Sequence, residues 1–345
     1  MKNHLLRPIY YQYQENLYGV HFHFMKVIPA VHVVEQAMLG THKRAPGMPS
    51  NYYRIREGEK VESIWETTSG TAGLALAYAC RWAGVPLGLV SDPVIEPPLQ
   101  AELKSLDVEV HLVDPEAAKA QSGVQNARLT LLHDILKTRR GAYWAKQYDN
   151  TEWRLSYYHV AAQIIAEVGK VDVLVCGTGS CASSTGLFEG TRMACPNVQL
   201  VGVDTIGSIL FDAPPLPRRL RGVGMGLIPG NLVRKYFTWI HWVSAPFAWT
   251  HAYLLHREHT VPVGPTTGAA FAVAKLIADT FPGRRVVFLG PDDSKRYEPK
   301  VFSPELMQRD ELWLPELPDE PRITDDPRDV CYSEHWWATE WGQKL

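Results

Sequence analysis

Residues 171–186, V-D-V-L-V-C-G-T-G-S-C-A-S-S-T-G, combine a strand, a glycine turn and the start of a helix. The largely apolar run Val171–Cys176 is suited to a parallel strand that is covered on both faces. A helix is expected over Thr185–Cys195, soon after the turn. Such a junction gathers backbone N–H groups at a helix N-terminus, where they can hold a phosphate. The stretch therefore predicts an α/β fold with an anion site.

Segments with strand and helix character alternate on both sides of this stretch. Upstream, strands are expected over 63–65, 87–90 and 109–113, and helices over 72–82, 98–106, 123–138 and 157–168. Downstream, the expected elements are a strand at 198–203, a helix at 268–280 and a strand at 285–289. This alternation predicts an α/β protein with parallel sheets. From about residue 299 the chain is rich in Pro, Glu and Asp, and an extension that wraps the body is expected there.

The composition narrows the class of protein. With 345 residues the chain can form one large domain or two ordinary ones, and 46% apolar residues support a packed core. Lys and Arg (35) balance Asp and Glu (37), so neither nucleic acid nor a membrane is expected as a partner. No secretory signal or bilayer-spanning stretch is recognised, and the five cysteines lack C-x-x-C spacing. We expect a cytoplasmic enzyme with reduced thiols and no metal site.

The glycine turn has more than one interpretation. Read as G-x-G-x-x-A with Asp204 at the end of the next strand, it fits a dinucleotide site. Read as a cup lined by Ser180, Ser183 and Ser184, it fits a single terminal phosphate. It can also be a tight turn that binds nothing. The turn alone does not separate these alternatives.

A second candidate anion site lies at residues 66–73, E-T-T-S-G-T-A-G, between a short strand and a strongly helical segment. The first N–H groups of a helix have no partner inside it, and the helix dipole favours a negative charge there. The hydroxyl groups and the glycine let a carboxylate or a phosphate approach closely. A simple N-cap is the structural alternative.

The order of these and further segments resembles the cysteine synthase/cystathionine β-synthase family of pyridoxal-phosphate enzymes, which have fold type II (tryptophan synthase β-like). The resemblance covers about residues 30–300 and rests on the segments 31–44, 66–73, 147–150, 177–186, 222–231, 266–269 and 293–297. It implies two parallel-sheet α/β domains with the cofactor in the cleft between them. The implied domains are 1–44 with 151–300 for the cofactor and 45–150 for the substrate loop, followed by the extension 301–345. A homodimer is expected.

The resemblance also implies roles for individual residues. Lys43, in G-T-H-K-R after a strand that ends at Glu35, matches the lysine that forms a Schiff base with pyridoxal 5'-phosphate. Thr266 matches the hydroxyl residue that faces the pyridine nitrogen. The residues implied for the phosphate cup are Gly177, Gly179, Ser180, Cys181, Ala182 and Ser183. Those implied for the substrate carboxylate are Thr68, Ser69, Gly70, Thr71 and Gln147, and Thr71 is also implied to contact the cofactor.

Two departures from the family pattern affect the expected reaction. Thr71 stands where the family usually has Asn, and Cys181 and Ala182 stand where it usually has Gly and Thr. The resemblance implies β-replacement on a small amino acid such as O-acetylserine, O-phosphoserine, serine or cysteine, through an aminoacrylate intermediate. The alternatives are β-elimination as in cysteine desulfhydrases and serine/threonine dehydratases, an NAD-dependent oxidoreductase that uses Asp204, and a scaffold without activity.

Overall fold

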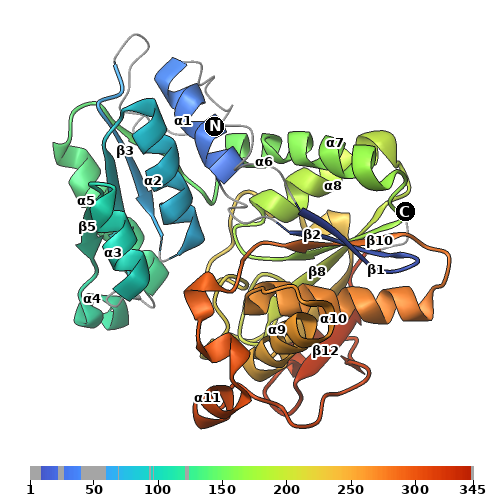
Figure 1. Cartoon of the computed structure of the whole chain (residues 1–345). Coiled ribbons are helices and arrows are strands. Elements are labelled where there is room, and N and C mark those ends of the chain that lie inside the picture. Colours follow the sequence, from blue (N-terminus) through green and yellow to red (C-terminus); the bar gives the residue numbers. More distant parts are fainter. Residues whose placement is uncertain are drawn as a thin grey trace. The chain divides into compact units, whose positions relative to one another are not determined.

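The chain divides into two compact units, each with its own sheet (Figure 1). The computed structural model describes residues 9–21, 27–39, 60–68, 70–92, 95, 97–120 and 124–342. The larger unit comprises Met1–Met25 and Arg154–Leu345, and the smaller one Lys26–Trp153. Compared with the predicted domains, residues 27–39 fall in the smaller unit and 301–342 in the larger one.

The larger unit is built on an eight-stranded sheet in the order β1-β2-β10-β7-β8-β9-β12-β11. Its strands are β1 (Ile9–Gln14), β2 (Leu17–His21), β7 (Val173–Gly177), β8 (Gln199–Thr205), β9 (Phe237–Val243), β10 (Val286–Gly290), β11 (Arg322–Ile323) and β12 (Trp336–Glu340). The five strands from β2 to β9 run parallel, whereas β1 and β12 join antiparallel. The predicted parallel sheet is confirmed for this unit.

Helices cover both faces of this sheet, with α7 and α8 on one side and α9 and α10 on the other (Figure 1). The helices are α7 (Tyr157–Val168), α8 (Ala182–Ala194), α9 (Ala245–His259), α10 (Pro265–Thr280) and α11 (Pro304–Arg309), with short 3-10 helices at Arg234–Tyr236, Lys295–Tyr297, Lys300–Phe302 and Pro327–Asp329. Because both faces are covered, all five residues of β10 are buried.

The smaller unit contains a four-stranded parallel sheet in the order β5-β4-β3-β6. Its elements are α1 (Val27–Leu39), β3 (Ser63–Thr67), α2 (Thr71–Ala83), β4 (Leu87–Ser91), α3 (Pro97–Ser105), β5 (Glu109–Leu112), α4 (Pro115–Ala120), α5 (Val124–Thr138), β6 (Ala142–Trp144) and, at the boundary, α6 (Thr151–Leu155). Helices α2 and α5 pack against β3 and β4. The strands and helices expected between 63 and 138 are therefore confirmed, with ends that differ by a few residues.

The segment that ends at Glu35 is a helix, so the strand expected there is wrong. The buried side chains of α1 are Ala30, Val33, Val34 and Ala37, which are spaced by three and four residues. This spacing puts them on one face of a helix, and α1 packs against α2. A strand would have turned Val33 and Val34 to opposite faces.

The region between β8 and α10 contains a strand and a helix that the sequence did not lead us to expect. Strand β9, F-T-W-I-H-W-V, is rich in aromatic and β-branched residues, which favour strands. Ser244 caps α9 by accepting a hydrogen bond from the N–H of Phe247 (3.3 Å). A Ser-x-Pro start of this kind is a helix signal that was available in the sequence.

The C-terminal segment completes the large sheet. Strand β12 pairs antiparallel with β9, and Trp336 and Trp337 are buried. Burial lowers the pKa of His241 to about 3, so its neutral ring accepts a hydrogen bond at Nδ1 from Trp336 Nε1 (3.0 Å). The tail is thus part of the larger unit and contributes to its core.

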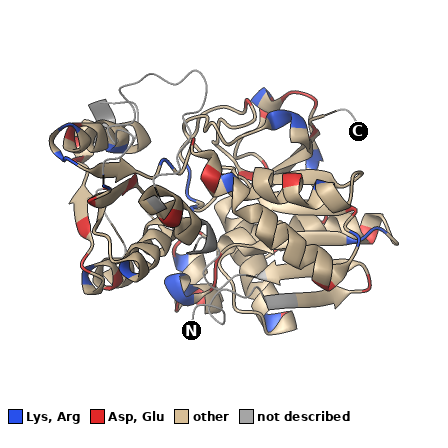
Figure 2. Cartoon of the chain, turned by 90° about the horizontal axis from the view of Figure 1, so that it is seen from above, with Lys and Arg blue, Asp and Glu red and all other residues tan. Residues whose placement is uncertain are grey.

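Charged residues and cysteines are spread over the chain. Basic and acidic residues are interspersed over both units (Figure 2). All five cysteines are free thiols, four of them buried. No helix among the described residues is long and apolar enough to cross a membrane. Within the same residues, no group of three or more His, Cys, Asp or Glu side chains could hold a metal ion.

Candidate functional site

The glycine turn of the larger unit lies between β7 and α8. Strand β7 ends at Gly177, and α8 begins at Ala182, three residues earlier than predicted. Cys181 stands at the N-cap with a positive φ of 60°, and its side chain makes no capping hydrogen bond. The first N–H groups of α8 are therefore without a partner from the helix or its cap. N–H groups of this kind can hold an anion, and the anion site at this turn stays a prediction.

The turn exposes some of its residues and buries others. Gly177, Gly179, Ser180 and Ser183 are partly exposed, whereas Cys181, Ala182 and Ser184 are buried. Ser184 donates a hydrogen bond to the carbonyl oxygen of Cys181 (3.3 Å), so its hydroxyl is used inside the structure. Only Ser180 and Ser183 of the three predicted serines offer partly exposed hydroxyl groups to a ligand.

A second glycine turn packs against the first. The N–H of Gly224 donates to the carbonyl oxygen of Thr178 (2.6 Å), and a Cβ on Gly179 would lie 3.3 Å from the carbonyl oxygen of Gly222. Gly222 has a φ of 91°, and a Cβ there would lie 2.6 Å from Thr266 Oγ1. Only a glycine fits this position without displacing the threonine. The G-V-G-M-G pattern signals this turn in the sequence, although we had not assigned it to the site.

Thr266 completes the same cluster from the start of α10. Its side chain is buried, and its hydroxyl donates to the carbonyl oxygen of Arg221 (3.3 Å). A Cβ on Gly177 would lie 3.2 Å from Thr266 Cγ2. The structure therefore brings Thr266 together with Gly177 and Gly222, although the three come from distant parts of the sequence. We call the set Gly177–Ser183, Gly222–Gly224 and Thr266 the glycine cradle.

Two buried titratable groups are Cys181, within the cradle, and Asp204, beside Gly224. Burial raises the pKa of Asp204 to about 7, and hydrogen bonds such as that from the N–H of Thr205 (2.8 Å) oppose the shift. Burial, followed by the charge of Asp204, raises the pKa of Cys181 to about 12. The thiol donates to the carbonyl oxygen of Gly179 (3.3 Å), so Cys181 packs as a neutral group. Asp204 is fully buried, unlike an acid that binds a ribose from the surface.

The smaller unit carries the candidate carboxylate loop between β3 and α2. Helix α2 begins at Thr71, and the residue before it, Gly70, supplies no side-chain cap. Thr68 is buried and accepts a hydrogen bond from the N–H of Gly70 (3.3 Å), whereas Gly70 and Thr71 are partly exposed. The uncapped helix start leaves N–H groups for an anion. Ser69 lies outside the described residues.

Gln147 is held beside this loop by the buried carboxyl group of Glu66. Its N–H donates to Glu66 Oε2 (2.7 Å), and its side-chain amide donates to the carbonyl oxygen of Thr67. Glu66 also accepts a hydrogen bond from the N–H of Thr67 (2.7 Å). Burial raises the pKa of Glu66 to about 7 against these hydrogen bonds. Sequence reasoning missed Glu66 as a support of the loop, although it begins the motif that we singled out.

Two lysines are candidates for the site, and the structure describes one of them. Lys43, the predicted Schiff-base lysine, lies outside the described residues. Lys146, next to Gln147, is buried, and this burial lowers its pKa while the charges of Asp149 and Glu66 oppose the shift. Its ammonium group lies 5.1 Å from the centre of the Trp144 ring. A lysine with a lowered pKa is a typical active-site group. Lys146 is therefore an alternative to Lys43 as the lysine that binds the cofactor, and this alternative can be tested.

The glycine cradle fits the phosphate of pyridoxal phosphate. Its backbone N–H groups at the start of α8 supply donors, and Ser180 and Ser183 supply partly exposed hydroxyl groups. The absence of Cβ atoms at Gly179 and Gly222 lets the two glycine turns and Thr266 pack closely together. Thr266 adds a neutral hydroxyl group. The buried Cys181 and Ala182, which depart from the family pattern, retain the backbone donors.

Known proteins resemble the chain in sequence and in fold. The model of the family described as "Pyridoxal-phosphate dependent enzyme" matches residues 38–292. The N-(2-amino-2-carboxyethyl)-L-glutamate synthase of Cupriavidus metallidurans is 30% identical over 257 residues, which cover 73% of each chain.

Two solved structures share the fold at lower identity. The O-acetylserine dependent cystathionine beta-synthase of Helicobacter pylori has a TM-score of 0.73 at 20% identity, covering 85% of this chain and 95% of that one. A hydrogen sulfide-producing enzyme of Fusobacterium nucleatum has a TM-score of 0.72 at 21% identity, covering 85% and 96%. The fold is that of fold type II enzymes, and the matched family favours pyridoxal phosphate over a dinucleotide. The chain belongs to the family of pyridoxal-phosphate dependent enzymes, the class that includes the cysteine synthases.

Proposed function

We propose that the chain catalyses β-replacement on a small β-substituted amino acid such as O-acetylserine, O-phosphoserine, serine or cysteine. The glycine cradle with Thr266, in a chain of this family, is the observation that carries the proposal. Pyridoxal phosphate, when bound, withdraws electrons from the α-carbon of an amino acid and lets a group on the β-carbon leave.

The residues of the chain have distinct tasks in this proposal. Lys43 holds the cofactor and moves the proton at the α-carbon of the substrate. The uncapped start of α2, with Thr68, Gly70 and Thr71, binds the substrate carboxylate, and Gln147 assists. Thr266 presents a neutral hydroxyl group, which can turn toward a ring nitrogen because its bond to Arg221 is long at 3.3 Å. A neutral partner disfavours a long-lived carbanion and thus transamination.

We propose an amino acid as the acceptor that replaces the leaving group. The name of the Cupriavidus relative describes a 2-amino-2-carboxyethyl group joined to the nitrogen of L-glutamate. That product has the carbon skeleton of a β-substituted alanine attached to an amine. The name of the Helicobacter structure describes that enzyme as O-acetylserine dependent. A β-substituted alanine as donor and an amine as acceptor account for the name of the Cupriavidus relative.

Product analysis tests the proposal. The holoenzyme is incubated with O-acetylserine or O-phosphoserine, in the presence of L-glutamate or of sulfide, and the products are identified by mass spectrometry. We expect a change in the visible absorbance of the cofactor with the donor alone and a carbon–nitrogen adduct when L-glutamate is added. Donors that neither change the absorbance nor yield an adduct would reject the proposal.

β-Elimination is the second candidate. Thr71 in place of the usual Asn favours it, and the Fusobacterium structure belongs to an enzyme named for producing hydrogen sulfide. Elimination predicts that pyruvate forms from cysteine or O-acetylserine at the same rate with and without an acceptor. Replacement predicts that an acceptor suppresses pyruvate.

We further propose a homodimer, which sedimentation of the holoenzyme tests directly.

A further inference from the structure

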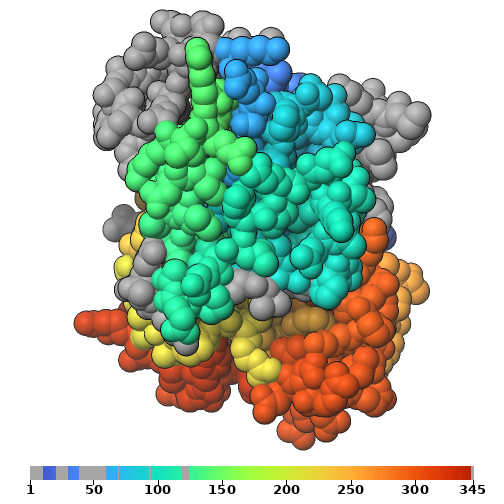
Figure 3. Space-filling view, turned by 90° about the vertical axis from the view of Figure 1, so that its left-hand side faces the viewer, coloured from blue at the N-terminus to red at the C-terminus, as the bar shows by residue number. Residues whose placement is uncertain are grey.

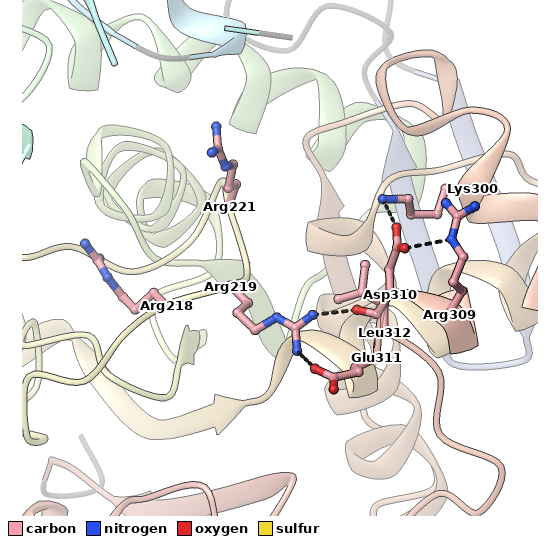
Figure 4. A pocket seen from close by; sticks show the side chains of 8 residues that line it. All are labelled: Arg218, Arg219, Arg221, Lys300, Arg309, Asp310, Glu311 and Leu312. Carbon is pink, nitrogen blue, oxygen red and sulfur yellow. Dashed lines mark hydrogen bonds and ion pairs between the residues drawn. The ribbon is translucent and has the colours of Figure 1, made fainter. Parts of the chain in front are cut away.

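A pocket of about 560 Å³ in the larger unit is lined mainly by basic side chains. Residues 218–221 form one side of it, and the segment from Lys300 to Leu312, which includes α11, forms the other (Figure 4). In Figure 3 the orange segment around α11 lies on the surface beside a yellow segment. The lining residues are Arg218, Arg219, Arg221, Lys300, Arg309, Asp310, Glu311 and Leu312. None of them belongs to the predicted site.

The pocket carries an excess of positive charge. Its five basic and two acidic residues give a formal net charge of +3. Arg219 pairs with Glu311 (Nη1 to Oε2, 3.0 Å), while Arg309 (Nε to Oδ1, 3.1 Å) and Lys300 share Asp310 (Figure 4). The two carboxylates of the lining therefore pair with three of its cations, and Arg218 interacts with the charge of Asp204.

The Arg219–Glu311 pair contributes little to protein stability. The side chains of Arg219 and Glu311 are 48% and 83% exposed, and pairs in such positions contribute little to folding. Like charges gathered in a concave surface repel each other and raise the local concentration of anions. Arginine also binds carboxylates through two parallel hydrogen bonds. A small anion with more than one acid group matches the charge and the donors of the pocket.

The pocket is connected to the glycine cradle through one short segment. The carbonyl oxygen of Arg221 accepts a hydrogen bond from Thr266 Oγ1 (3.3 Å), and the next residue, Gly222, packs on the same threonine. The segment 218–222 therefore lines the pocket at one end and the cradle at the other. A ligand held by these arginines contacts the chain next to the proposed site of reaction.

We propose that this basic pocket binds a small dicarboxylate, and that the ligand is the anionic acceptor of the proposed β-replacement. The assignment of the acceptor rests on the proposed function, whereas the binding of a dicarboxylate does not. The pocket volume is within the range of small-molecule sites, so an amino acid with an acidic side chain fits it. A dicarboxylate that binds without being consumed, as an effector, would use the same chemistry.

Calorimetric titration of the holoenzyme with glutarate and with L-glutamate tests the pocket, because glutarate lacks the amine and reports on acid recognition alone. We expect Arg219→Gln to raise the Kd of both ligands about ten-fold, which is the loss of one charged contact. Glu311→Gln removes the carboxylate that occupies Arg219, so it should lower the Kd several-fold. The matched control is Arg192→Gln on α8, an exposed arginine outside the pocket, which should leave the Kd unchanged.

The outcomes separate the pocket from the proposed function. Equal Kd values for glutarate in the wild type, Arg219→Gln and Glu311→Gln would overturn the pocket. If wild-type enzyme binds glutarate but its cofactor absorbance does not respond to O-acetylserine, the proposed reaction fails and the pocket stands. Consumption of L-glutamate into an adduct identifies the bound ligand as the acceptor. Binding without consumption identifies it as an effector and rejects the acceptor assignment.

Discussion

Glu66 connects the pH dependence of stability to the candidate carboxylate loop. Its carboxyl group is fully buried and holds the N–H groups of Thr67 and Gln147. Burial raises its pKa from 4.5 to about 7, so the folded state binds more protons than the unfolded state between these values. The contribution of Glu66 to the free energy of unfolding is therefore full below pH 4.5 and is lost as the pH rises through 7.

The variant Glu66→Gln cannot lose this proton. We expect its free energy of unfolding, relative to the wild type, to rise between pH 5 and pH 8 by up to about 3 kcal/mol. Urea unfolding at the two pH values measures the difference. Asp204, with a pKa also raised to about 7 by burial, remains in both proteins and cancels in the comparison. If the difference in free energy of unfolding between the variant and the wild type is the same at pH 5 and pH 8, Glu66 does not titrate in this range.

Substitution of Gly222 tests the glycine cradle, and Gly283 serves as the matched control because it has a similar backbone conformation outside the cradle. Gly222 has a φ of 91°, and a Cβ there would lie 2.6 Å from Thr266 Oγ1. Gly283 has a φ of 89°, and nothing lies within 4 Å of its Cβ position. Alanine at either position costs about 1–2 kcal/mol for the left-handed backbone. Only Gly222→Ala also pushes on Thr266.

We expect Gly222→Ala to weaken the binding of pyridoxal phosphate at least ten-fold and Gly283→Ala to leave it unchanged. Titration of the apoenzyme with the cofactor, followed by absorbance, gives both affinities. Circular dichroism shows whether each variant is folded. Equal cofactor affinities in two folded variants would place the cofactor away from Thr266.

At the scale of elements, the sequence predicts those helices and strands whose apolar residues follow a clear local pattern. Strands β3 and β4 follow from apolar runs in the sequence, because nearly all of their residues are buried, and α7 follows from its apolar helical face. The family motif predicts a strand that ends at Glu35, whereas the spacing of the buried Ala30, Val33, Val34 and Ala37 is that of the observed helix α1. Strand β12 was missed because its pairing with β9 joins residues about 95 apart, which local patterns do not reveal.

Substitution of Trp336 tests how much strand β12 contributes to the stability of the larger unit. The side chain is 3% exposed, packs against Phe247 with ring centres 5.0 Å apart, and donates to His241. We expect Trp336→Ala to lower the free energy of unfolding by about 3–5 kcal/mol, since it leaves a large cavity. Trp336→Phe keeps most of the ring and removes the donor, so about 1–3 kcal/mol is expected. Denaturant unfolding followed by circular dichroism checks both, and equal losses would contradict the packing described.

At the scale of the molecule, two α/β units each present an uncapped helix start at the carboxyl end of a parallel strand. The larger unit presents α8 after β7, and the smaller unit presents α2 after β3. The sequence predicted both junctions, since each combines an apolar run with a glycine turn. It did not predict the packing of Gly222 on Thr266 or the basic pocket, because these join residues that are distant in the chain. The predicted position of the cofactor between the units, and the role of Lys43, stay predictions.

Reduction of the holoenzyme with borohydride, followed by peptide mapping, tests the central claim most directly. The reagent fixes the cofactor covalently to the lysine that carries it. The account predicts a single labelled peptide that contains Lys43, and loss of the label in Lys43→Ala. A label on Lys146, the lysine whose pKa is lowered by burial, or no labelled lysine in a folded holoenzyme, would contradict it.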